Sequence, residues 1–429
     1  MARELNSSEI PDGWSYGLLD KYAERCSGHT PSKSFPDYWD GGIKWISLAD
    51  SFRLDKGLVK ETDKEISKLG TENSSAQVHP AGTVVLSRDA GIGKSGVMAE
   101  PMAVSQHFIA WKCDFNNKIH NWFLYNWLQT NKHEFERQAV GSTIKTIGLP
   151  YFKKLKIALP PYEEQRKIAK ILSTWDKAIA TTGKLIETSK QQKKALMQQL
   201  LTGKKRLRSS SKDGAETGKA FEGEWEEVKL SHLFDRMAEK NKGQSTNVVT
   251  ISAQHGLIKQ QEFFKKSVAS ETLDNYFILR KGQFAYNKSY SNGYPMGAIK
   301  RLNRYDDAVV TSLYICFAIK DEAKTSSCFM EQYFESGLLN RGLTKVAAEG
   351  GRAHGLLNVK PSDFMGLSLI VPTFDEQQKI ASVLTAADKE IEVLETKLAH
   401  FKQEKKALMQ QLLTGKCRVK VAQEKDLIC

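Results

Sequence analysis

The stretch with the most reactive residue types is Arg88-Asp89-Ala90-Gly91-Ile92-Gly93-Lys94-Ser95, which ends like a phosphate-binding loop. That loop needs a glycine five residues before Gly93, and Arg88 stands there. We therefore predict no nucleotide hydrolysis from this stretch. Its Arg and Lys side chains make it either a turn able to touch DNA phosphates or an ordinary tight turn.

Other potentially catalytic patterns are incomplete as well. Leu159-Pro160-Pro161-Tyr162 is similar to the Asn/Asp-Pro-Pro-Tyr active site of adenine-N6 methyltransferases, but a leucine cannot accept a hydrogen bond from the adenine amine. Pro36-Asp37 is not followed by a nuclease Glu-x-Lys pair at a suitable distance. The nine histidines form no metal-ligand pair, and the six cysteines form no Cys-x-x-Cys. The sequence thus predicts no catalytic residue and no metal site.

Composition and charge indicate a globular protein with an anionic partner. The chain has 429 residues, of which 40% are hydrophobic, so we expect two or three folding units. It contains no apolar run of about 20 residues and no N-terminal signal, which predicts a cytoplasmic protein without membrane contact. Sixty-three Lys and Arg against fifty Asp and Glu leave a net charge of +13. Such an excess favours nucleic acid as a partner, although a merely solvated basic surface would look the same.

A repeat organises the chain. The twelve residues Lys193–Lys204 recur unchanged at Lys405–Lys416, 212 residues later. At the same offset Pro160 aligns with Pro372, Glu164-Gln165 with Glu376-Gln377, and Asp176 with Asp388. An aligned stretch of this length indicates an internal duplication.

Each copy predicts a long helix. Acidic residues follow the Pro turn and a Thr-Gly pair closes the pattern, which gives about 39 residues, or roughly 58 Å. Apolar residues between these signals alternate in steps of three and four, as in a coiled coil. The predicted seam comprises Ile168, Leu172, Trp175, Ile179, Ile186, Leu196 and Leu200 in the first helix and Ile380, Leu384, Ile391, Leu394, Leu398, Phe401, Leu408 and Leu412 in the second.

Polar residues interrupt this seam. Thr182, Ser189 and Lys193 occupy seam positions of the first helix, so its middle should pack less tightly than its ends. We expect Lys193 and Lys405, at equivalent positions, to set the register or to reach solvent rather than to bind DNA.

The linker after the first helix predicts how the helices are oriented. A flexible coil of some 20 residues spans only about 25 Å, which is well short of the helix length. The second domain must therefore begin near the far end of the first helix, and the second helix must run back along it. The predicted fold class is α+β, with two globular domains separated by an antiparallel coiled coil and related by a pseudo-twofold axis. The predicted boundaries are 1–159 and 224–371 for the two domains, 160–203 and 372–416 for the two helices, 204–223 for the linker, and 417–429 for the C-terminal tail.

Two variable domains, each followed by a near-identical helix ending in Ala-Leu-Met-Gln-Gln-Leu-Leu-Thr-Gly-Lys, resemble the DNA-specificity (S) subunit of type I restriction–modification systems. The resemblance runs from about Trp14 to Lys416. Gly141-Ser142-Thr143 is similar to the signature that closes the family's target-recognition domains. In the second domain, residues 350–358 form a variant of this signature. The variant would affect which bases the domain reads and not its resemblance to the family.

The resemblance implies a division of labour. Each target-recognition domain would contact one half of an asymmetric, bipartite site in double-stranded DNA, and the helices would set the spacer between the halves. Two modification subunits would dock on the chain and methylate adenine with S-adenosylmethionine. A restriction/translocase subunit could join and use ATP and Mg²⁺. The chain itself would be a non-catalytic subunit without a cofactor.

Base contacts require polar side chains on loops that can enter a DNA groove. Each candidate could equally be ordinary turn chemistry. The predicted DNA-contacting residues are Arg88, Lys94, Ser95, Ser142, Thr143 and Lys145 in the first domain and Asn287, Lys288, Tyr290, Asn292, Tyr294, Arg352 and His354 in the second.

Charge differs between the two helical stretches. Residues 163–206 carry eleven basic and four acidic residues, whereas residues 375–418 carry eight and seven. The more cationic stretch suits a DNA backbone, an acidic partner surface, or solvent alone. Two other functions remain open at this point: a coiled-coil adaptor that binds no DNA, and a self-contained enzyme, against which the incomplete motifs argue.

Overall fold

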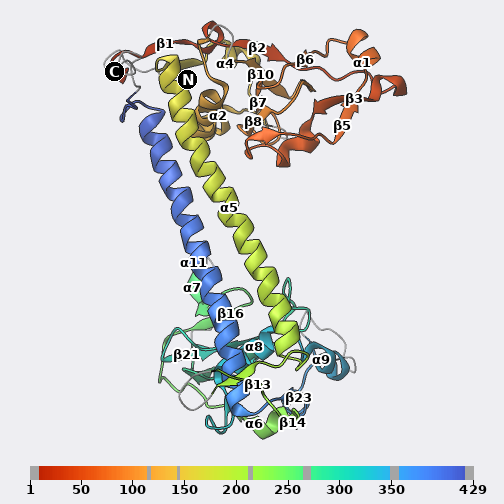
Figure 1. Ribbon diagram of the computed structural model, residues 1–429, viewed down its shortest axis with the longest axis vertical. Helices are drawn as coiled ribbons and strands as arrows, with labels where there is room; N and C mark the ends of the chain where they lie inside the picture. Colours follow the sequence, from red (N-terminus) through yellow and green to blue (C-terminus); the bar gives the residue numbers. More distant parts are fainter. Residues whose placement is uncertain are drawn as a thin grey trace. The chain divides into compact units, whose positions relative to one another are not determined.

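The computed structural model describes residues 9–113, 117–142, 145–210, 216–263, 272–347 and 357–420. The chain divides into two compact units. Unit 1 comprises Met1–Gly183 and Thr396–Cys429, and unit 2 comprises Lys184–Glu395. Each contains a globular domain and part of the long helices α5 (Tyr162–Leu200) and α11 (Phe374–Leu412) (Figure 1). We call the residues up to 159 domain 1 and residues 224–371 domain 2.

Domain 1 contains two sheets. In the first, antiparallel strands follow the order β2–β10–β7–β8, and β4 joins β8 in parallel. In the second, the order is β5–β3–β9–β6, with β3 and β9 parallel. The bounds are β2 (Glu24–Ser27), β3 (Trp39–Ile46), β4 (Leu58–Val59), β5 (Lys64–Ile66), β6 (Val78–His79), β7 (Val84–Ser87), β8 (Ser95–Met98), β9 (Met102–Val104) and β10 (Phe108–Lys112).

Helices cover the first sheet of domain 1. The run Val84–Ser87 is wholly buried, as expected for a strand covered on both faces. Helix α2 (Asn121–Thr130) packs against β7 and β8. Trp111, Phe123, Phe135 and Phe152 fill the core between sheet and helices. The remaining helical elements are η2 (Leu19–Lys21), η3 (Pro36–Tyr38), η4 (Leu48–Phe52), α1 (Lys68–Glu72), α3 (Lys132–Gln138) and α4 (Leu149–Lys153).

Domain 2 is built in the same way. Its antiparallel sheet has the order β15–β22–β19–β20, and α8 packs on β20. The pairs β16–β17 and β18–β21 are joined by a parallel bridge between Val248 and Val309. The bounds are β15 (Phe234–Met237), β16 (Val249–Ser252), β17 (Gly256–Lys259), β18 (Phe277–Arg280), β19 (Phe284–Asn287), β20 (Ala298–Arg301), β21 (Asp307–Val310), β22 (Ile315–Ile319), α6 (Leu230–Leu233), α7 (Gln260–Phe263), α8 (Ser327–Glu335), α9 (Asn340–Ala347) and α10 (Pro361–Met365).

The two domains share one topology. The order β2–β10–β7–β8 corresponds to β15–β22–β19–β20, and β5–β3–β9–β6 corresponds to β17–β16–β21–β18. The sequences of these interiors look dissimilar, so the shared strand order emerges only from the structure. One connection differs. Residues 47–63, which include η4 and β4, join β3 to β5, whereas residues 253–255 alone join β16 to β17.

A two-stranded ladder leads from each domain into its helix. Strand β1 (Ser15–Leu18) pairs with β11 (Lys156–Leu159), and β14 (Glu226–Lys229) pairs with β23 (Ser368–Val371). The chain then enters α5 and α11, each of 39 residues as predicted. The strands β12 (Arg208–Ser210) and β13 (Glu216–Ala220) pair within the connection that follows α5.

A buried glutamine fixes the start of each helix. The side-chain amide of Gln165 donates to the Pro160 carbonyl at 2.9 Å, and its oxygen accepts from the backbone N–H of His120 at 2.8 Å. Gln377 donates to the Pro372 carbonyl at 2.9 Å and accepts from the N–H of Ser326 at 2.9 Å. The duplicated glutamine therefore joins the Pro turn before each long helix to the residue that precedes a helix of the same domain, α2 or α8.

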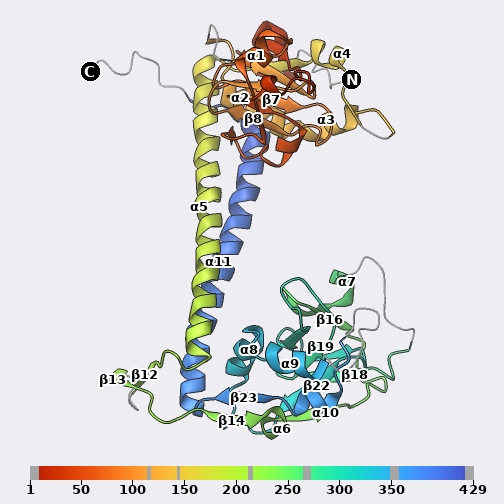
Figure 2. The same ribbon diagram turned by 90° about the vertical axis from the view of Figure 1, so that its right-hand side faces the viewer.

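Within each unit the helices pack side by side and run in opposite directions (Figures 1 and 2). In unit 1, Lys405 Nζ lies 2.6 Å from Asp176, and the Trp175 ring meets Phe401 edge-on at 5.6 Å. In unit 2, Lys193 Nζ lies 2.5 Å from Asp388. The two ion pairs are equivalent at the 212-residue offset, so the prediction that these lysines set the register agrees with the contacts that they make.

The seam is most deeply buried where the helices meet the domains. Ile168 and Leu172 join the core of domain 1, and Leu200, Ile380 and Leu384 join that of domain 2. The middle of the first helix was predicted to pack loosely, but Thr182 and Ile186 are buried there. The half-buried seam residues Leu394, Leu398 and Phe401 lie in α11 instead. The domains cover only the helix ends.

An arginine closes each helix pair. In unit 2, Arg206 after α5 donates two hydrogen bonds, of 2.6 and 2.7 Å, to the buried carboxylate of Glu376. In unit 1, Arg418 after α11 donates to Glu164 at 2.9 and 2.8 Å. Paired donation of this kind is the strongest form of an arginine–carboxylate contact.

Candidate nucleic-acid interface

In domain 1 the two predicted contact segments meet. The turn between β7 and β8 carries Arg88, whose Nε donates to the Ile147 carbonyl at 3.1 Å, and Asp89, which contacts Thr146. These bonds bring residues 145–147 against the turn, although 57 and 59 residues separate the bonded partners along the chain. Ser142 and Lys145 are exposed beside it. Thr143 lies outside the described residues.

Backbone N–H groups of the glycine-rich turn donate hydrogen bonds to carbonyl groups of the same turn. The N–H of Gly93 donates to the Ser87 carbonyl at 3.0 Å, and the N–H of Lys94 donates to that of Gly91 at 3.1 Å. Both glycines have positive φ, of +79° and +78°. The turn is therefore a hairpin connection and not a cradle for a nucleotide phosphate. Ser95 is fully buried and accepts a hydrogen bond from Gln129 at 2.8 Å, so its side chain faces the interior.

A small hollow with three lysines opens beside this turn. It has a volume of about 260 Å³ and is lined by Gly91, Ile92, Lys94, Lys132, Glu136 and Lys145. Lys94 and Lys132 are anchored, by the Ser51 carbonyl at 3.1 Å and by Asp55 at 2.6 Å. Lys145 is exposed. The surface is thus cationic and suited to phosphate groups.

Domain 2 repeats the arrangement with different side chains. The turn between β19 and β20 lies against the segment that precedes α10, because the Leu357 N–H donates to the Lys288 carbonyl at 3.1 Å. Asn287 accepts from the Ser289 N–H at 3.0 Å, which shapes the start of the turn. Tyr290, 64% exposed, and Asn292 project from it. Arg352 and His354 lie outside the described residues.

Tyr294 lies on the inner side of this turn. Its hydroxyl donates to Glu335 at 2.7 Å, and Lys300 contacts the same carboxylate. Burial, together with the negative charge of Glu335, raises the pKa of the Tyr294 hydroxyl. The side chain therefore fastens the turn to α8, and Tyr290 and Asn292 are the more accessible candidates.

Domain 2 also has a polar hollow that sequence analysis did not identify. It has a volume of about 330 Å³ and is lined by Thr246, Asn247, Val248, Lys259, Gln260, Gln261 and Tyr305. The amide oxygen of Asn247 and the hydroxyl of Tyr305 are buried without a partner among the described residues. The amide-rich Gln260-Gln261 pair was the available signal, but only the structure brings it beside Asn247.

The Leu-Pro-Pro-Tyr stretch has a structural role. Leu159 ends β11 with its side chain buried, and the Pro160 carbonyl accepts from Gln165. The described residues contain no cluster of three or more His, Cys, Asp or Glu side chains placed to hold a metal ion. Of the helices in that same part of the chain, none is long and apolar enough to cross a membrane.

Comparison with known proteins extends the resemblance seen in the repeat. The family described as "Type I restriction modification DNA specificity domain" matches residues 11–191. The MjaVIII type I specificity subunit of Methanocaldococcus jannaschii is 25% identical over 97% of this chain and 96% of its own length. The chain belongs to the type I restriction–modification specificity subunits.

Further relatives and solved structures agree with this placement. The HindI specificity subunit of Haemophilus influenzae is 22% identical over 38% of this chain and 36% of its own length. The crystal structure of an S subunit from M. genitalium covers 98% of this chain and 99% of that one, with 14% identity and a TM-score of 0.55. This likeness confirms the fold: two β-rich domains with two long helices packed together.

As a specificity subunit, the chain supplies DNA recognition and no catalysis to its complex. Its two hairpin surfaces lie in the two target-recognition domains. Both are built on the same strand pair, β7–β8 and β19–β20, but domain 1 presents lysines where domain 2 presents Tyr290 and Asn292.

Proposed function

We propose that this subunit directs its complex to an asymmetric, two-part DNA sequence, of which each domain reads one half. The single observation that carries the proposal is the pair of domains with one topology and unlike exposed side chains, each followed by the same helix. Identical readers would favour a palindrome, whereas unlike readers favour two different half-sites.

The contact residues follow from accessibility. In domain 1 the exposed Ser142 and Lys145, with Arg88 and Lys94 behind them, form a surface suited to phosphates. In domain 2, Asn287, Lys288, Tyr290 and Asn292 line the hairpin turn, and the amide-rich hollow offers Asn247 and Gln260 for base edges. Thr143, Arg352 and His354 remain candidates on the adjoining segments, outside the described residues.

The helix pair acts as a spacer in this proposal. Repeated contacts at both ends of α5 and α11, through Gln165, Gln377 and the two Arg–Glu pairs, support a stiff connection. We propose that the pair sets the distance between the half-sites and binds two modification subunits, which methylate adenine with S-adenosylmethionine. Restriction/translocase subunits with ATP and Mg²⁺ would complete the complex, and all of these cofactors would belong to the partners.

Mapping methylated adenines in host DNA with and without this gene tests the proposal. We expect one bipartite sequence to lose its methylation when the gene is removed. Shortening both helices by one turn should then change the tolerated spacer and leave the half-sites as they are. An unchanged methylation map would overturn the proposal, and changed half-sites with an unchanged spacer would overturn the spacer role.

A further inference from the structure

A groove of about 830 Å³ runs within unit 1 between domain 1 and the helices. One side is formed by Asp55–Lys60 and by α2. The other side is formed by α5 from Ser173 to Ala180 and by α11 from Lys405 to Gln410. The wall at Asp55–Lys60 belongs to the 47–63 connection, which has no equivalent of its length in domain 2.

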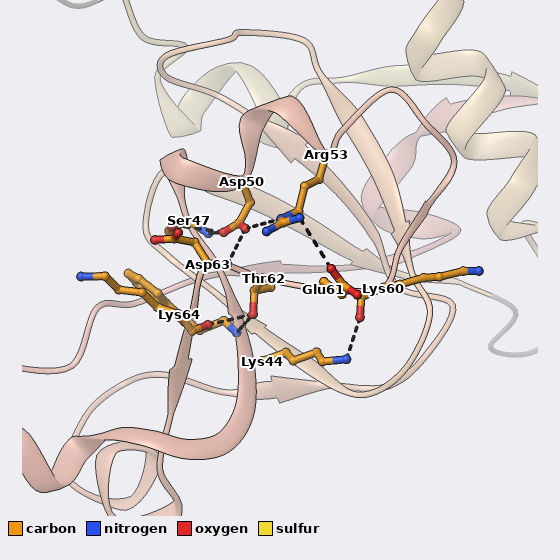
Figure 3. A network of polar contacts seen from close by, with 10 residues as sticks. Lys44, Ser47, Asp50, Arg53, Lys60, Glu61, Thr62, Asp63 and Lys64 are labelled. Carbon is orange, nitrogen blue, oxygen red and sulfur yellow. Dashed lines mark hydrogen bonds and ion pairs between the residues drawn. The ribbon is translucent and has the colours of Figure 1, made fainter. Parts of the chain in front are cut away.

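The buried carboxylate of Asp50 links the two ends of this connection (Figure 3). Asp50 is completely buried and accepts hydrogen bonds from the N–H of Ser47 at 2.9 Å and from the N–H of Asp63 at 2.7 Å. Arg53 Nε donates to the same side chain at 3.1 Å. These bonds join the two ends of the connection to each other.

A second carboxylate holds the middle. Asp55 accepts from the Ser95 N–H at 3.0 Å and from Gln129 at 2.6 Å, and it pairs with Lys132 at 2.6 Å. Strand β4, which follows, is paired with β8. The wall is therefore preorganised, and Lys56, Leu58 and Lys60 are presented at fixed positions.

The charge of the groove is unbalanced. Its two carboxylates, Asp55 and Asp176, are each paired with a lysine at 2.6 Å. Four lysines of the lining have no acidic partner among the described residues: Lys56, Lys60, Lys177 and Lys406. A neighbouring hollow of about 490 Å³ shares Trp122 and Ser173 and adds Lys167 and Lys170, together with Arg166, which pairs with Glu163 at 3.0 Å.

The interior of the groove is partly apolar. Trp122, Ile179 and Met409 line it, together with Leu58, whose side chain is 42% exposed. DNA interfaces are polar and use basic side chains against phosphates, so an apolar lining contributes little to them. An amphipathic peptide segment, in contrast, lays its apolar face into such a groove.

The described residues of unit 2 form no wall like Asp55–Lys60, because residues 253–255 alone join β16 to β17. The equivalent face of α11 borders a hollow lined by Ser326, Cys328, Gln378, Ala381, Ser382, Thr385, Ala386 and Lys389. At the 212-residue offset, Gln378 and Ser382 stand where α5 has Arg166 and Lys170. Lys167 and Lys177 keep basic counterparts in α11, Lys379 and Lys389.

We propose that the groove of unit 1 receives an acidic, amphipathic segment of the modification subunit. Apolar side chains of that segment contact Trp122, Leu58 and Met409, while its carboxylates meet Lys56, Lys60, Lys177 and Lys406. This inference rests on the proposed function, because it names the chemistry of one of its two docking sites. It also makes the two sites unequal, since the described residues of unit 2 include no counterpart of the Asp55–Lys60 wall or of its two lysines, although Lys389 and Lys194 correspond to Lys177 and Lys406.

A charge-reversal variant of the full chain tests the groove. Lys56→Glu/Lys60→Glu is titrated with the purified cognate modification subunit, and stoichiometry is read by native mass spectrometry. We expect one modification subunit to remain bound and the other to bind about tenfold more weakly or less well still. Lys33→Glu/Lys68→Glu, which changes the net charge equally on exposed parts of domain 1, should assemble like the wild type. Thermal unfolding of both variants checks that they fold.

A photo-crosslinker in place of Leu58 gives an independent readout. It should attach to a segment of the modification subunit that contains acidic and apolar residues, whereas the same group in place of the exposed Leu69 should not. Unchanged assembly of Lys56→Glu/Lys60→Glu overturns the inference. Normal assembly with weakened DNA binding by the complex also overturns it, because the groove would then contact DNA. If the wild-type complex methylated no specific sequence, the proposed function would fail instead.

Discussion

Domain 1 and domain 2 have the same two sheets in the same strand order, and they enter their helices through the same hydrogen bonds. Their differences lie on the surface and in one connection. The β7–β8 side of domain 1 is lined by lysines, while the β19–β20 side of domain 2 presents Tyr290, Asn292 and a hollow rich in amides. The helices and the residues that join them to the domains are repeated at a fixed offset, whereas the interiors and the hairpin turns of the domains are not. The duplicated helices have thus been kept while the two domains diverged around a common strand order.

The largest expected effect tests whether the frameworks are equivalent. Replacing Gln165 or Gln377 by leucine removes the partners of several backbone groups at a helix start, each of which is costly to leave unsatisfied. We expect each substitution to lower the free energy of unfolding by about 3 kcal/mol in urea titrations. The exposed Gln198→Leu serves as the control. A clearly smaller loss for one glutamine than for the other would contradict the equivalence.

The second-largest expected effect is a difference between the two domains in how much stability they lose in acid. His79 on β6 is buried without a partner for either ring nitrogen among the described residues, and burial lowers its pKa to about 4. Leu279 occupies the equivalent place on β18. Because the unfolded chain, with a histidine pKa near 6.5, binds the proton more tightly, stability is lost as pH falls from about 6.5 towards 4.

At pH 4.5 this loss should reach about 2.5 kcal/mol. Hydrogen exchange at pH 7 and pH 4.5 should therefore show domain 1 opening more easily in acid than domain 2. His79→Leu should remove the difference. Equal acid sensitivity of the two domains in the wild type would rule out this assignment.

Substitutions on the hairpin surface of domain 2 should change base discrimination, whereas those on the surface of domain 1 should change overall DNA affinity. Tyr290→Ala or Asn292→Ala should reduce discrimination in the second half-site by about tenfold to a hundredfold, because base contacts carry sequence information. Lys145→Ala should weaken binding to all sequences alike and reduce the salt dependence, as expected for a phosphate contact. Binding to a library of sites at two salt concentrations separates the outcomes. Altered base preference in Lys145→Ala would reverse the assignment for domain 1.

The smallest effect concerns the arginines that close the helix pair. Arg206→Met leaves the buried Glu376 uncompensated, and Arg418→Met does the same to Glu164. We expect a loss of about 2 kcal/mol for Arg206 and about 1 kcal/mol for Arg418, whose side chain is more exposed and better screened. Thermal unfolding at fixed pH measures both. An unchanged midpoint for either variant would show that its pair adds nothing to stability.

The helices were the most predictable part of the molecule. Their 39-residue lengths, their starts after the Pro turns and the seam residues follow from signals within a few residues of each other. Lys193 and Lys405 were expected either to set the register or to reach solvent, and only the structure pairs them with Asp388 and Asp176 on the facing helix. The packing within the seam was harder to predict, because burial at a position such as Thr182 depends on the side chains of the facing helix.

The site was only partly predictable. Two candidate segments in each domain were predicted from turn chemistry and from the resemblance to the family, but the sequence did not separate exposed side chains from buried ones. Ser95 and Tyr294 have the same polar character as Ser142 and Tyr290, yet they face the interior. Asn247 and Tyr305 were missed because they meet only when β16 and β21 are joined.

The sequence alone determined the duplication, the helix pair, its antiparallel direction and the family, since repeats, heptads and caps are local patterns. The common strand order of the two domains, the exposure of each candidate side chain and the groove of unit 1 were decided by the tertiary structure. These features depend on contacts between residues far apart along the chain, such as Asp55 with Lys132, and no local pattern records such contacts.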